Sequence, residues 1–180
     1  MSQNNPLVII GGSGSAGHYL MQRLASAGMK AHVISRRFHV VDVPSGFTKG
    51  QADLTSGVWT ATAGACVISF APLWLLAESL PRFVGIKSII AIGSTSRYSK
   101  INSSDAHERS VATLLISAEE TIQLWAEKNN VSWTILRPTL IYDGQRDQNI
   151  TRMARFIRRG HFLPLAAPAH SCGRCCQGGL

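Results

Sequence analysis

The chain has 180 residues, a length that corresponds to one domain with a sizeable core. Its apolar fraction of 45% and its charged fraction of 16% exclude an intrinsically disordered chain. The net charge of +8 does not locate a basic patch. An anionic cofactor or substrate also requires basic residues, so we do not expect a nucleic-acid partner.

The N-terminus lacks the charged and apolar pattern of a secretory leader. The longest apolar stretch, Ala65 to Ala77, contains Ser69 and Pro72 and is shorter than the roughly 20 residues that a bilayer requires. We therefore expect a soluble, cytoplasmic protein with no membrane partner.

The first predicted element is a strand over Leu7 to Ile10, whose four apolar residues indicate burial on both faces. A turn with Gly11, Gly14 and Gly17 follows, and helical spacing begins at Ala16. This spacing permits a tight turn, a close approach to a pyrophosphate, and close packing of the helix on the strand. The unpaired N–H groups and the positive end of the helix then face the phosphates. A plain tight turn is the alternative, but its position between a strand and a helix predicts a dinucleotide site.

The second predicted strand covers Ala31 to Ser35, and a strand–helix–strand unit of this length suits a right-handed crossover. Sites for NAD usually place Asp or Glu at the end of this strand, whereas this chain has Arg36 and Arg37. Two guanidinium groups match a 2′-phosphate, so we expect NADP as the cofactor, with NAD possible. A pair of solvated loop arginines is the alternative.

The remaining periodic segments predict strands and helices in alternation. Strands are expected over Ala65 to Ser69, Ser88 to Ile92 and Trp133 to Leu136, and helices over Leu73 to Phe83 and Asp105 to Asn129. This alternation predicts a single Rossmann-like α/β domain, in which a doubly wound parallel sheet carries helices on both faces.

Two polar sites interrupt this pattern. Asp53, within Gly50 to Leu54, either caps the next helix or lies beside an adenine ring. The segment Gly93 to Ser96 directly follows a buried strand, at the end of the sheet where α/β folds bind ligands. Ser94 in this segment has an ordinary alternative, which is to satisfy backbone groups of its own loop.

Four stretches follow the order of one enzyme family: the glycine turn, Gly50 to Leu54, Ile92 to Tyr98 and Leu136 to Asp143. Over residues 6 to 165, the chain resembles the extended or atypical short-chain dehydrogenase/reductases. The matching branch is that of the NAD(P)-dependent epimerase/dehydratases, which includes nucleotide-sugar epimerases. Arg137-Pro138 and Tyr142 are more specific than the glycine motif, which many Rossmann proteins share.

The resemblance implies oxidoreduction or epimerisation of a small carbonyl or nucleotide-sugar substrate. It implies that Ser94 is catalytic, because its hydroxyl would hydrogen-bond the reacting substrate oxygen. A homodimer through the helix over Asp105 to Asn129 is also implied. The implied cofactor-binding residues are Gly11, Ser13, Gly14, Ser15, Ala16, Gly17, Arg36, Arg37, Asp53, Leu54, Phe70, Ala71 and Pro138.

The chain departs from the family in its acid/base residues, which are usually a Tyr-xxx-Lys pair on the helix after the Ser94 strand. The corresponding segment, Glu108 to Glu120, contains neither tyrosine nor lysine. Tyr98 and Lys100 are two residues apart and precede that helix, so their spacing does not replace the pair. A non-catalytic NADP-binding sensor or scaffold is therefore the alternative function.

The C-terminal region departs from the family as well. We assign residues 1–165 to the NAD(P)-binding domain and residues 166–180 to an irregular tail rich in cysteine and glycine. Family members continue into a substrate-binding region that is mostly absent here, so we expect a truncated or frameshifted end.

Two side-chain groups near this end permit local interpretations. Cys172, Cys175 and Cys176 lack a second cysteine pair, and we assign no metal site to them. Arg152, Arg155 and Arg159 share one face of a predicted helix, which either meets a substrate diphosphate or is simply solvated.

Overall fold

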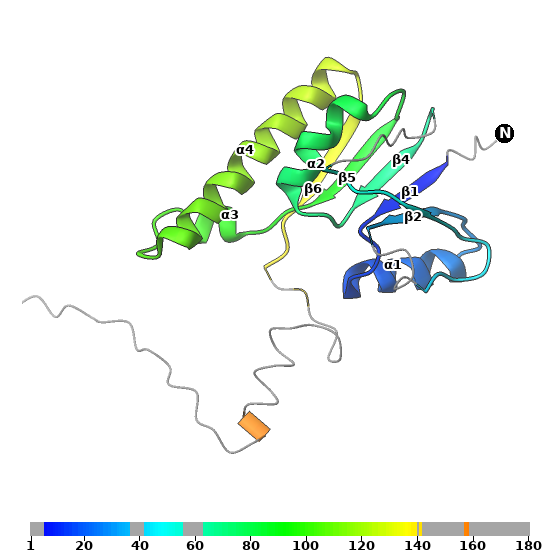
Figure 1. Cartoon of the computed structure of the whole chain (residues 1–180), viewed down its shortest axis with the longest axis horizontal. Coiled ribbons are helices and arrows are strands. Elements are labelled where there is room, and N and C mark those ends of the chain that lie inside the picture. Colours follow the sequence, from blue (N-terminus) through cyan, green and yellow to red (C-terminus); the bar gives the residue numbers. More distant parts are fainter. Residues whose placement is uncertain (1–5, 37–41, 56–62, 140, 142–156, 159–180) are drawn as a thin grey trace, which may run out of the picture.

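The computed structural model describes residues 6–36, 42–55, 63–139, 141 and 157–158. Its centre is a six-stranded parallel sheet in the order β3-β2-β1-β4-β5-β6 (Figure 1). The strands are β1 (Leu7–Ile10), β2 (His32–Ser35), β3 (Thr48–Gln51), β4 (Cys66–Ser69), β5 (Ser88–Ile92) and β6 (Ser132–Leu136). The chain proceeds outward from β1 to β3 and then returns to the other side of β1, which is the doubly wound order that the sequence predicts.

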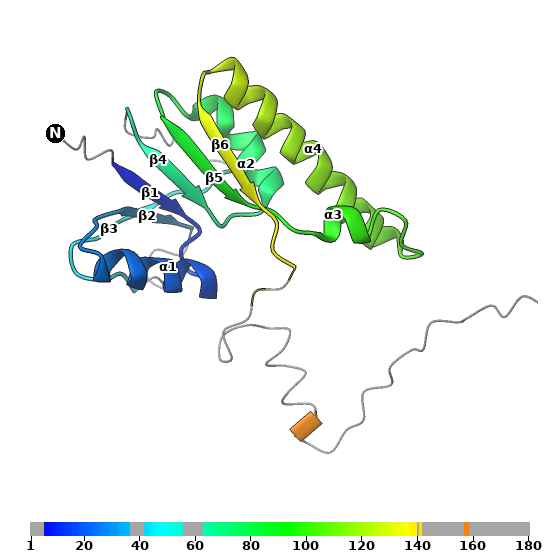
Figure 2. The ribbon, with the colours of Figure 1, turned by 180° about the vertical axis from the view of Figure 1, so that it is seen from behind.

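Helices cover the sheet on two sides (Figure 2). The helical elements are α1 (Ser15–Ser26), α2 (Leu73–Ser79), the short 3-10 helix η2 (Leu80–Arg82), α3 (Ser96–Ser99) and α4 (Ala106–Lys128), and α3 lies against α4. Helix α1 packs under β1 and β2, whereas α2 and α4 pack on the opposite face. The Rossmann-like α/β fold predicted from the sequence is confirmed.

Strand β1 contributes to both layers of the core because its side chains alternate between the two faces of the sheet. Ile9 packs with Met21 of α1 and Val33 of β2. Val8 and Ile10 pack in the larger cluster with residues of α2 and α4. The exposed fraction is at most 3% for all three β1 residues, so the expected burial on both faces is confirmed.

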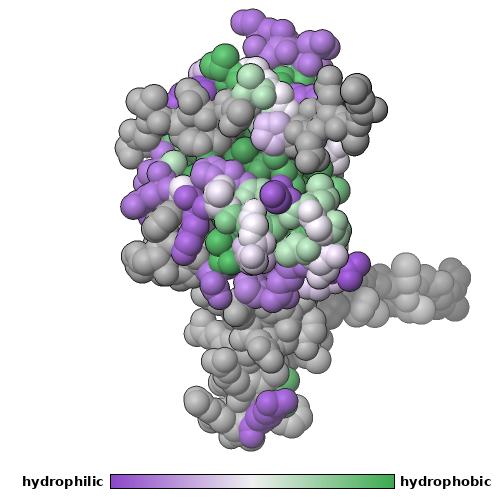
Figure 3. All heavy atoms as spheres, turned by 90° about the vertical axis from the view of Figure 1, so that its right-hand side faces the viewer, coloured by the Kyte–Doolittle hydropathy of each residue, from purple (hydrophilic) through white to green (hydrophobic). Residues whose placement is uncertain are grey.

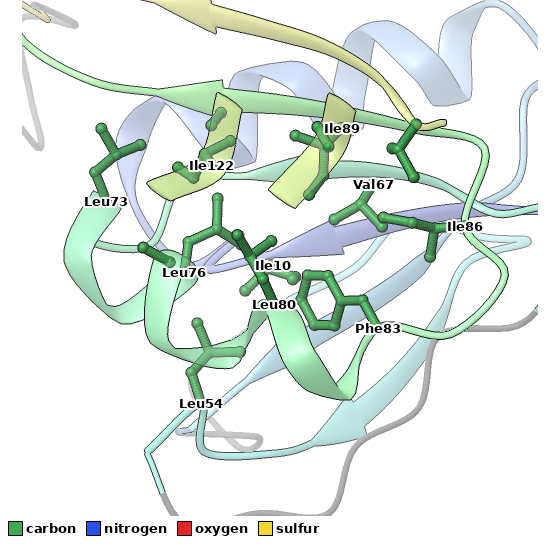
Figure 4. Packing of buried hydrophobic residues seen from close by; sticks show 14 of the residues in the cluster. Ile10, Leu54, Val67, Leu73, Leu76, Leu80, Phe83, Ile86, Ile89 and Ile122 are labelled. Atoms are coloured by element: carbon green, nitrogen blue, oxygen red, sulfur yellow. The ribbon is translucent and has the colours of Figure 1, made fainter. Parts of the chain in front are cut away.

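The larger core cluster lies between the sheet and the α2–α4 layer (Figure 4). Leu73, Leu76 and Leu80 follow one another at helical spacing, and each is at most 1% exposed. Ile122 of α4 reaches the same cluster and is fully buried. Burial of this apolar surface fixes both helices against the sheet.

Three local features differ from the sequence prediction. Strand β3 was not predicted because its sequence, Thr-Lys-Gly-Gln, is polar, and three of its four residues are exposed at the sheet edge. The predicted helix over Leu73 to Phe83 ends as α2 at Ser79 and continues as η2, where Pro81 lacks a backbone N–H for the α-helical pattern. The four-residue helix α3 was also not predicted.

Several predictions lie outside the described residues. They concern Arg37, Tyr142, Arg152, Arg155, Arg159, the tail cysteines and the domain boundary at 165. No helix in the described ranges is long and apolar enough to cross a membrane. Figure 3 shows a mixture of hydrophilic and hydrophobic residues on the side of the molecule that lies at the right of Figure 1, a mixture that is ordinary for protein surfaces.

Candidate functional site

A pocket of about 390 Å³ lies at the carboxyl ends of β1, β2, β3 and β4. This position is the topological switch point, where the strand order reverses and α/β sheets bind ligands. Eight of the predicted cofactor residues line the pocket: Gly11, Ser13, Gly14, Arg36, Asp53, Leu54, Phe70 and Ala71. The fold therefore brings together four stretches that are distant in sequence.

Gly11 closes the turn directly after β1. Its φ angle is +74°, a conformation that glycine adopts without a steric penalty. A Cβ atom at this position would lie 3.1 Å from the backbone nitrogen of Ala71. The Gly11 N–H donates to the carbonyl of Ile34 at 2.9 Å, so the turn is held between the ends of β2 and β4.

Gly17 allows α1 to pack directly on this turn. A Cβ atom at Gly17 would lie 2.7 Å from the Cα of Gly12, a distance at which backbone atoms must move. Gly12 is similarly crowded, because its Cβ would lie 2.9 Å from Cγ1 of Val33. The prediction assigned close helix packing to Gly17 but missed Gly12, which lies outside the motif spacing.

Gly14 is the N-cap of α1 and faces open space. No described atom lies within 4 Å of the position that its Cβ would take, and no side chain caps the helix within the described residues. The first hydrogen bond of the helix runs from His18 N to Gly14 O at 2.9 Å. The N–H groups of Ser15, Ala16 and Gly17 precede this bond, at the positive end of the helix.

This arrangement fits a dinucleotide pyrophosphate. Gly14 leaves room for a close approach, and the first turn of α1 supplies backbone donors to an anion. Ser15, Ala16 and Gly17 belong to this turn but do not line the pocket wall itself. We therefore expect these three residues to bind the pyrophosphate through their backbone N–H groups.

Arg36 and Asp53 lie at the outer part of the same pocket. The Asp53 carboxylate accepts hydrogen bonds from the backbone N and the hydroxyl of Thr55, at 2.9 and 2.8 Å. These two bonds, with a smaller contribution from the positive charge of Arg36, lower the pKa of Asp53. Asp53 is thus ionised at neutral pH and forms a local turn with Thr55. A helix capped by Asp53 would begin at Leu54 and continue into residues 56–62, which are outside the described ranges.

Ser94 lies apart from this pocket, in the loop between β5 and α3. Its hydroxyl donates to the Ser96 hydroxyl at 3.0 Å and accepts from the Ser96 N–H at 3.1 Å. Pro138 lies beside the same loop, because its carbonyl accepts from the Thr95 N–H at 3.3 Å. Neither Ser94 nor Pro138 lines the glycine-turn pocket.

Behind this loop lies a cluster of three charged side chains that the sequence reasoning missed, the Arg97–Glu119–Arg137 cluster. The Glu119 side chain is only 4% exposed. Arg137 Nε lies 3.0 Å from both carboxylate oxygens of Glu119, and Arg137 Nη2 lies 2.7 Å from Oε2 of Glu119. Arg97 Nη1 also donates to Oε2. The sequence does contain one sign of this cluster, which is a glutamate on the apolar face of a long helix, between Leu115 and Ile122.

Helix α4 carries neither tyrosine nor lysine between Glu108 and Glu120. Leu115 is buried in the core, and Val111 packs against it. Tyr98 is 62% exposed, with the Arg97 guanidinium 4.9 Å from its ring centre. Lys100 instead pairs with Glu108 at 2.6 Å. Tyr98 and Lys100 therefore have different partners and do not form a substitute pair.

Comparisons with known proteins define the fold of the chain. No protein-family profile matches it, and no curated protein matches its sequence. One similar solved structure is MoeE5 in complex with UDP-glucose and NAD, with 19% identity and a TM-score of 0.65 over 86% of this chain. Another is the UDP-glucose 4-epimerase of Thermus thermophilus in complex with NAD, with 15% identity and a TM-score of 0.65 over 86%. Vestitone reductase from alfalfa has 13% identity and a TM-score of 0.55 over 73%.

The chain spans 62%, 63% and 56% of the lengths of these three proteins, respectively. At such low identities, the likeness concerns the arrangement of strands and helices. The chain thus shares its Rossmann-like fold with MoeE5, with a UDP-glucose 4-epimerase and with a reductase.

Proposed function

We propose that the chain binds a nicotinamide dinucleotide in the glycine-turn pocket. The observation that carries this proposal is the convergence of eight predicted residues on one pocket at the switch point of the sheet. Gly11, Gly14 and the first turn of α1 would hold the pyrophosphate, and Arg36 the adenosine ribose. Leu54 and Phe70 supply apolar surface for the rings. NAD in two structures of similar fold supports the proposal.

The test is to fill the open space at Gly14. A Gly14→Val side chain meets no described atom within 4 Å of its Cβ, and the φ of Gly14 is −79°, so the variant should fold. It would obstruct the pyrophosphate and weaken NADPH binding about tenfold or more, the equivalent of one lost charge-assisted hydrogen bond. The matched control is Ser26→Ala, at the other end of α1. Unchanged NADPH affinity in Gly14→Val, measured by cofactor fluorescence, would overturn the proposal.

We favour NADP over NAD for this pocket. Arg36 is the cation at the end of β2, and a guanidinium suits a 2′-phosphate in charge and geometry. Asp53 is the carboxylate in the described pocket lining, and it already accepts two hydrogen bonds from Thr55. Asp53 follows β3, whereas sites for NAD usually place the ribose-binding acid at the end of β2. NAD stays the alternative.

For the reaction, we infer oxidoreduction or epimerisation of a small carbonyl or nucleotide-sugar substrate, with Ser94 orienting the substrate oxygen. The hydroxyls of Ser94 and Ser96 stand at the carboxyl end of β5, next to the strand that borders the cofactor pocket. Consumption of NADPH with a carbonyl or nucleotide-sugar panel, abolished in Ser94→Ala, supports this reaction. Turnover that persists in Ser94→Ala would contradict the role proposed for Ser94.

The alternative is a protein that binds the cofactor without turnover. The observation in its favour is that α4 carries neither tyrosine nor lysine between Glu108 and Glu120, and that Tyr98 and Lys100 do not form a substitute pair. If NADPH binds but none of the panel compounds is converted, this alternative is preferred.

We also propose a homodimer through α4. Leu114 and Leu124 are 44% and 67% exposed on this helix, and pairing of two copies would cover them. Light scattering should then detect a dimer that becomes monomeric in Leu124→Lys, and a wild-type monomer would exclude this pairing.

A further inference from the structure

The Arg97–Glu119–Arg137 cluster contains more positive than negative charge. Two guanidinium groups share the single carboxylate of Glu119. Glu120, next to Glu119 in the chain, is exposed on the outer side of α4. Lys100 and Glu108, which lie nearby in the sequence, form an ion pair of their own. Within the cluster, one positive charge is therefore not neutralised.

This excess charge is partly withdrawn from water. The Arg97 and Arg137 side chains are 20% and 32% exposed. Arg97 Nε is buried and has no hydrogen-bond partner among the described residues. The buried Nε is out of reach of an anion at the surface, whereas the exposed parts of the guanidinium groups are accessible. An unbalanced charge that is partly withdrawn from water costs free energy, and an anion at these exposed parts would reduce that cost.

The cluster lies directly behind the loop that carries Ser94. A Cβ atom at Gly93 would stand 3.4 Å from Oε1 of Glu119, and Gly93 N donates to Leu136 O at 2.7 Å. Arg97 and Arg137 thus flank the carboxyl ends of the neighbouring strands β5 and β6, the edge of the sheet where α/β folds receive ligands. Because Ser94 donates to the Ser96 hydroxyl, the proton of Ser96 is left for another acceptor.

We propose that the Arg97–Glu119–Arg137 cluster binds an oxyanion, either a phosphate or a carboxylate group, of an acidic substrate. The planar forks of the two arginines suit such a group. Glu119 neutralises part of this positive charge, so its carboxylate limits the anion affinity of the two guanidinium groups. This site is separate from the glycine-turn pocket and does not depend on dinucleotide binding.

The experiment is an NMR titration of the ¹⁵N-labelled full chain with inorganic phosphate and, in a second series, with acetate. The readouts are the Nε–H signals of Arg97 and Arg137 and the backbone amide signals of Ser94 to Arg97. Saturable shifts with phosphate alone indicate a phosphorylated substrate, and saturable shifts with acetate alone indicate a carboxylate substrate. Shifts confined to Ser13 and Gly14 would place the anion in the glycine-turn pocket and overturn the proposal.

Charge variants separate binding from a purely structural role. Arg97→Gln should lower the anion affinity about tenfold, whereas Arg97→Lys keeps the charge but not the planar fork and should lose less affinity. Glu119→Gln should raise the affinity roughly threefold or more, because one neutralising charge is removed. Arg23→Gln, an exposed arginine on α1, is the matched control and should have no effect.

The decisive result is a lower anion affinity in Arg97→Gln together with a higher anion affinity in Glu119→Gln. Equal losses in Arg97→Gln and Glu119→Gln would show that the cluster only maintains the fold, and would overturn the proposal. If Arg97→Gln does not fold, the comparison of Arg97→Lys and Glu119→Gln with wild type keeps the test decisive. NADPH is titrated separately, and its effect on the Ser13 and Gly14 signals reports on the dinucleotide site alone.

Discussion

Gly17 is the residue at which α1 comes closest to the turn after β1. A Cβ atom there would stand 2.7 Å from Gly12 Cα, and neither backbone can withdraw easily. We expect Gly17→Ala to destabilise the protein by about 1–3 kcal/mol, in spite of the higher helix propensity of alanine. Urea unfolding measures this change. The comparison variant is Gly14→Ala, which meets open space and should lose less stability; an equal or smaller loss in Gly17→Ala would contradict the packing argument.

At the residue scale, the sequence predicts backbone roles better than side-chain networks. The roles of Gly11 and Gly17 follow from their position between a strand and a helix. Glu119 could not be assigned partners in the same way, because Arg97 and Arg137 lie 22 and 18 residues away in the chain. Only the packing of α4 against the ends of β5 and β6 brings these three charges together.

At the scale of the element, α4 begins where its sequence indicates. The Asp105 carboxylate accepts from the His107 N–H at 2.7 Å and caps the helix. Asp105→Ala should lower the free energy of unfolding by about 0.5–2 kcal/mol, because one helix-end donor loses its acceptor. Asp105→Asn should retain most of the stability, since the amide oxygen also accepts. Chemical denaturation of both variants checks the cap, and equal losses would argue against it.

The connection between α3 and α4 predicts a pH dependence. Hydrogen bonds from Lys100 and Ser103 lower the pKa of Glu108 below its ordinary value of 4.5. A carboxyl group with a lowered folded-state pKa contributes stability above its unfolded pKa and loses it as the pH falls. The stability difference between wild type and Glu108→Gln should therefore be constant near neutral pH and shrink below pH 4.5.

Thermal unfolding across the acid range measures this dependence. The pKa of Asp53 is also lowered, so both proteins lose the stabilising contribution of ionised Asp53 as the pH falls. This loss is the same in both proteins and cancels in the comparison. A difference that grows toward low pH would mean that the charged form of Glu108 is not the stabilised one.

Elements with an apolar pattern are predictable from this sequence, and those without one are not. Strands β1, β4 and β5 are apolar runs that pack against helices, so their sequences already indicate burial. Strand β3 pairs with β2 at the sheet edge, and its polar side chains carry no such pattern. Its existence depends on the hydrogen bonds that β2 offers, which is a property of the assembled sheet.

At the scale of the whole molecule, the parallel sheet explains why distant motifs converge. The carboxyl ends of β1, β2, β3 and β4 meet at one edge, so Gly11, Arg36, Asp53 and Phe70 line one pocket. The sequence predicts this convergence for Gly11, Arg36 and Phe70 because each follows a predicted strand, whereas Asp53 follows β3, which the sequence does not predict. The separation of Ser94 and Pro138 from the pocket depends on the strand order in space, with β5 and β6 beyond β4, which single motifs do not reveal.

The central claim is that the glycine-turn pocket binds a phosphorylated nicotinamide dinucleotide, and a calorimetric titration tests it most directly. Wild type and Arg36→Ala are each titrated with NADPH and with NADH. We predict one NADPH per chain and tighter binding than for NADH. In Arg36→Ala, NADPH affinity should fall about tenfold or more and NADH affinity should change little. Absence of heat with either cofactor in the wild type would contradict the claim.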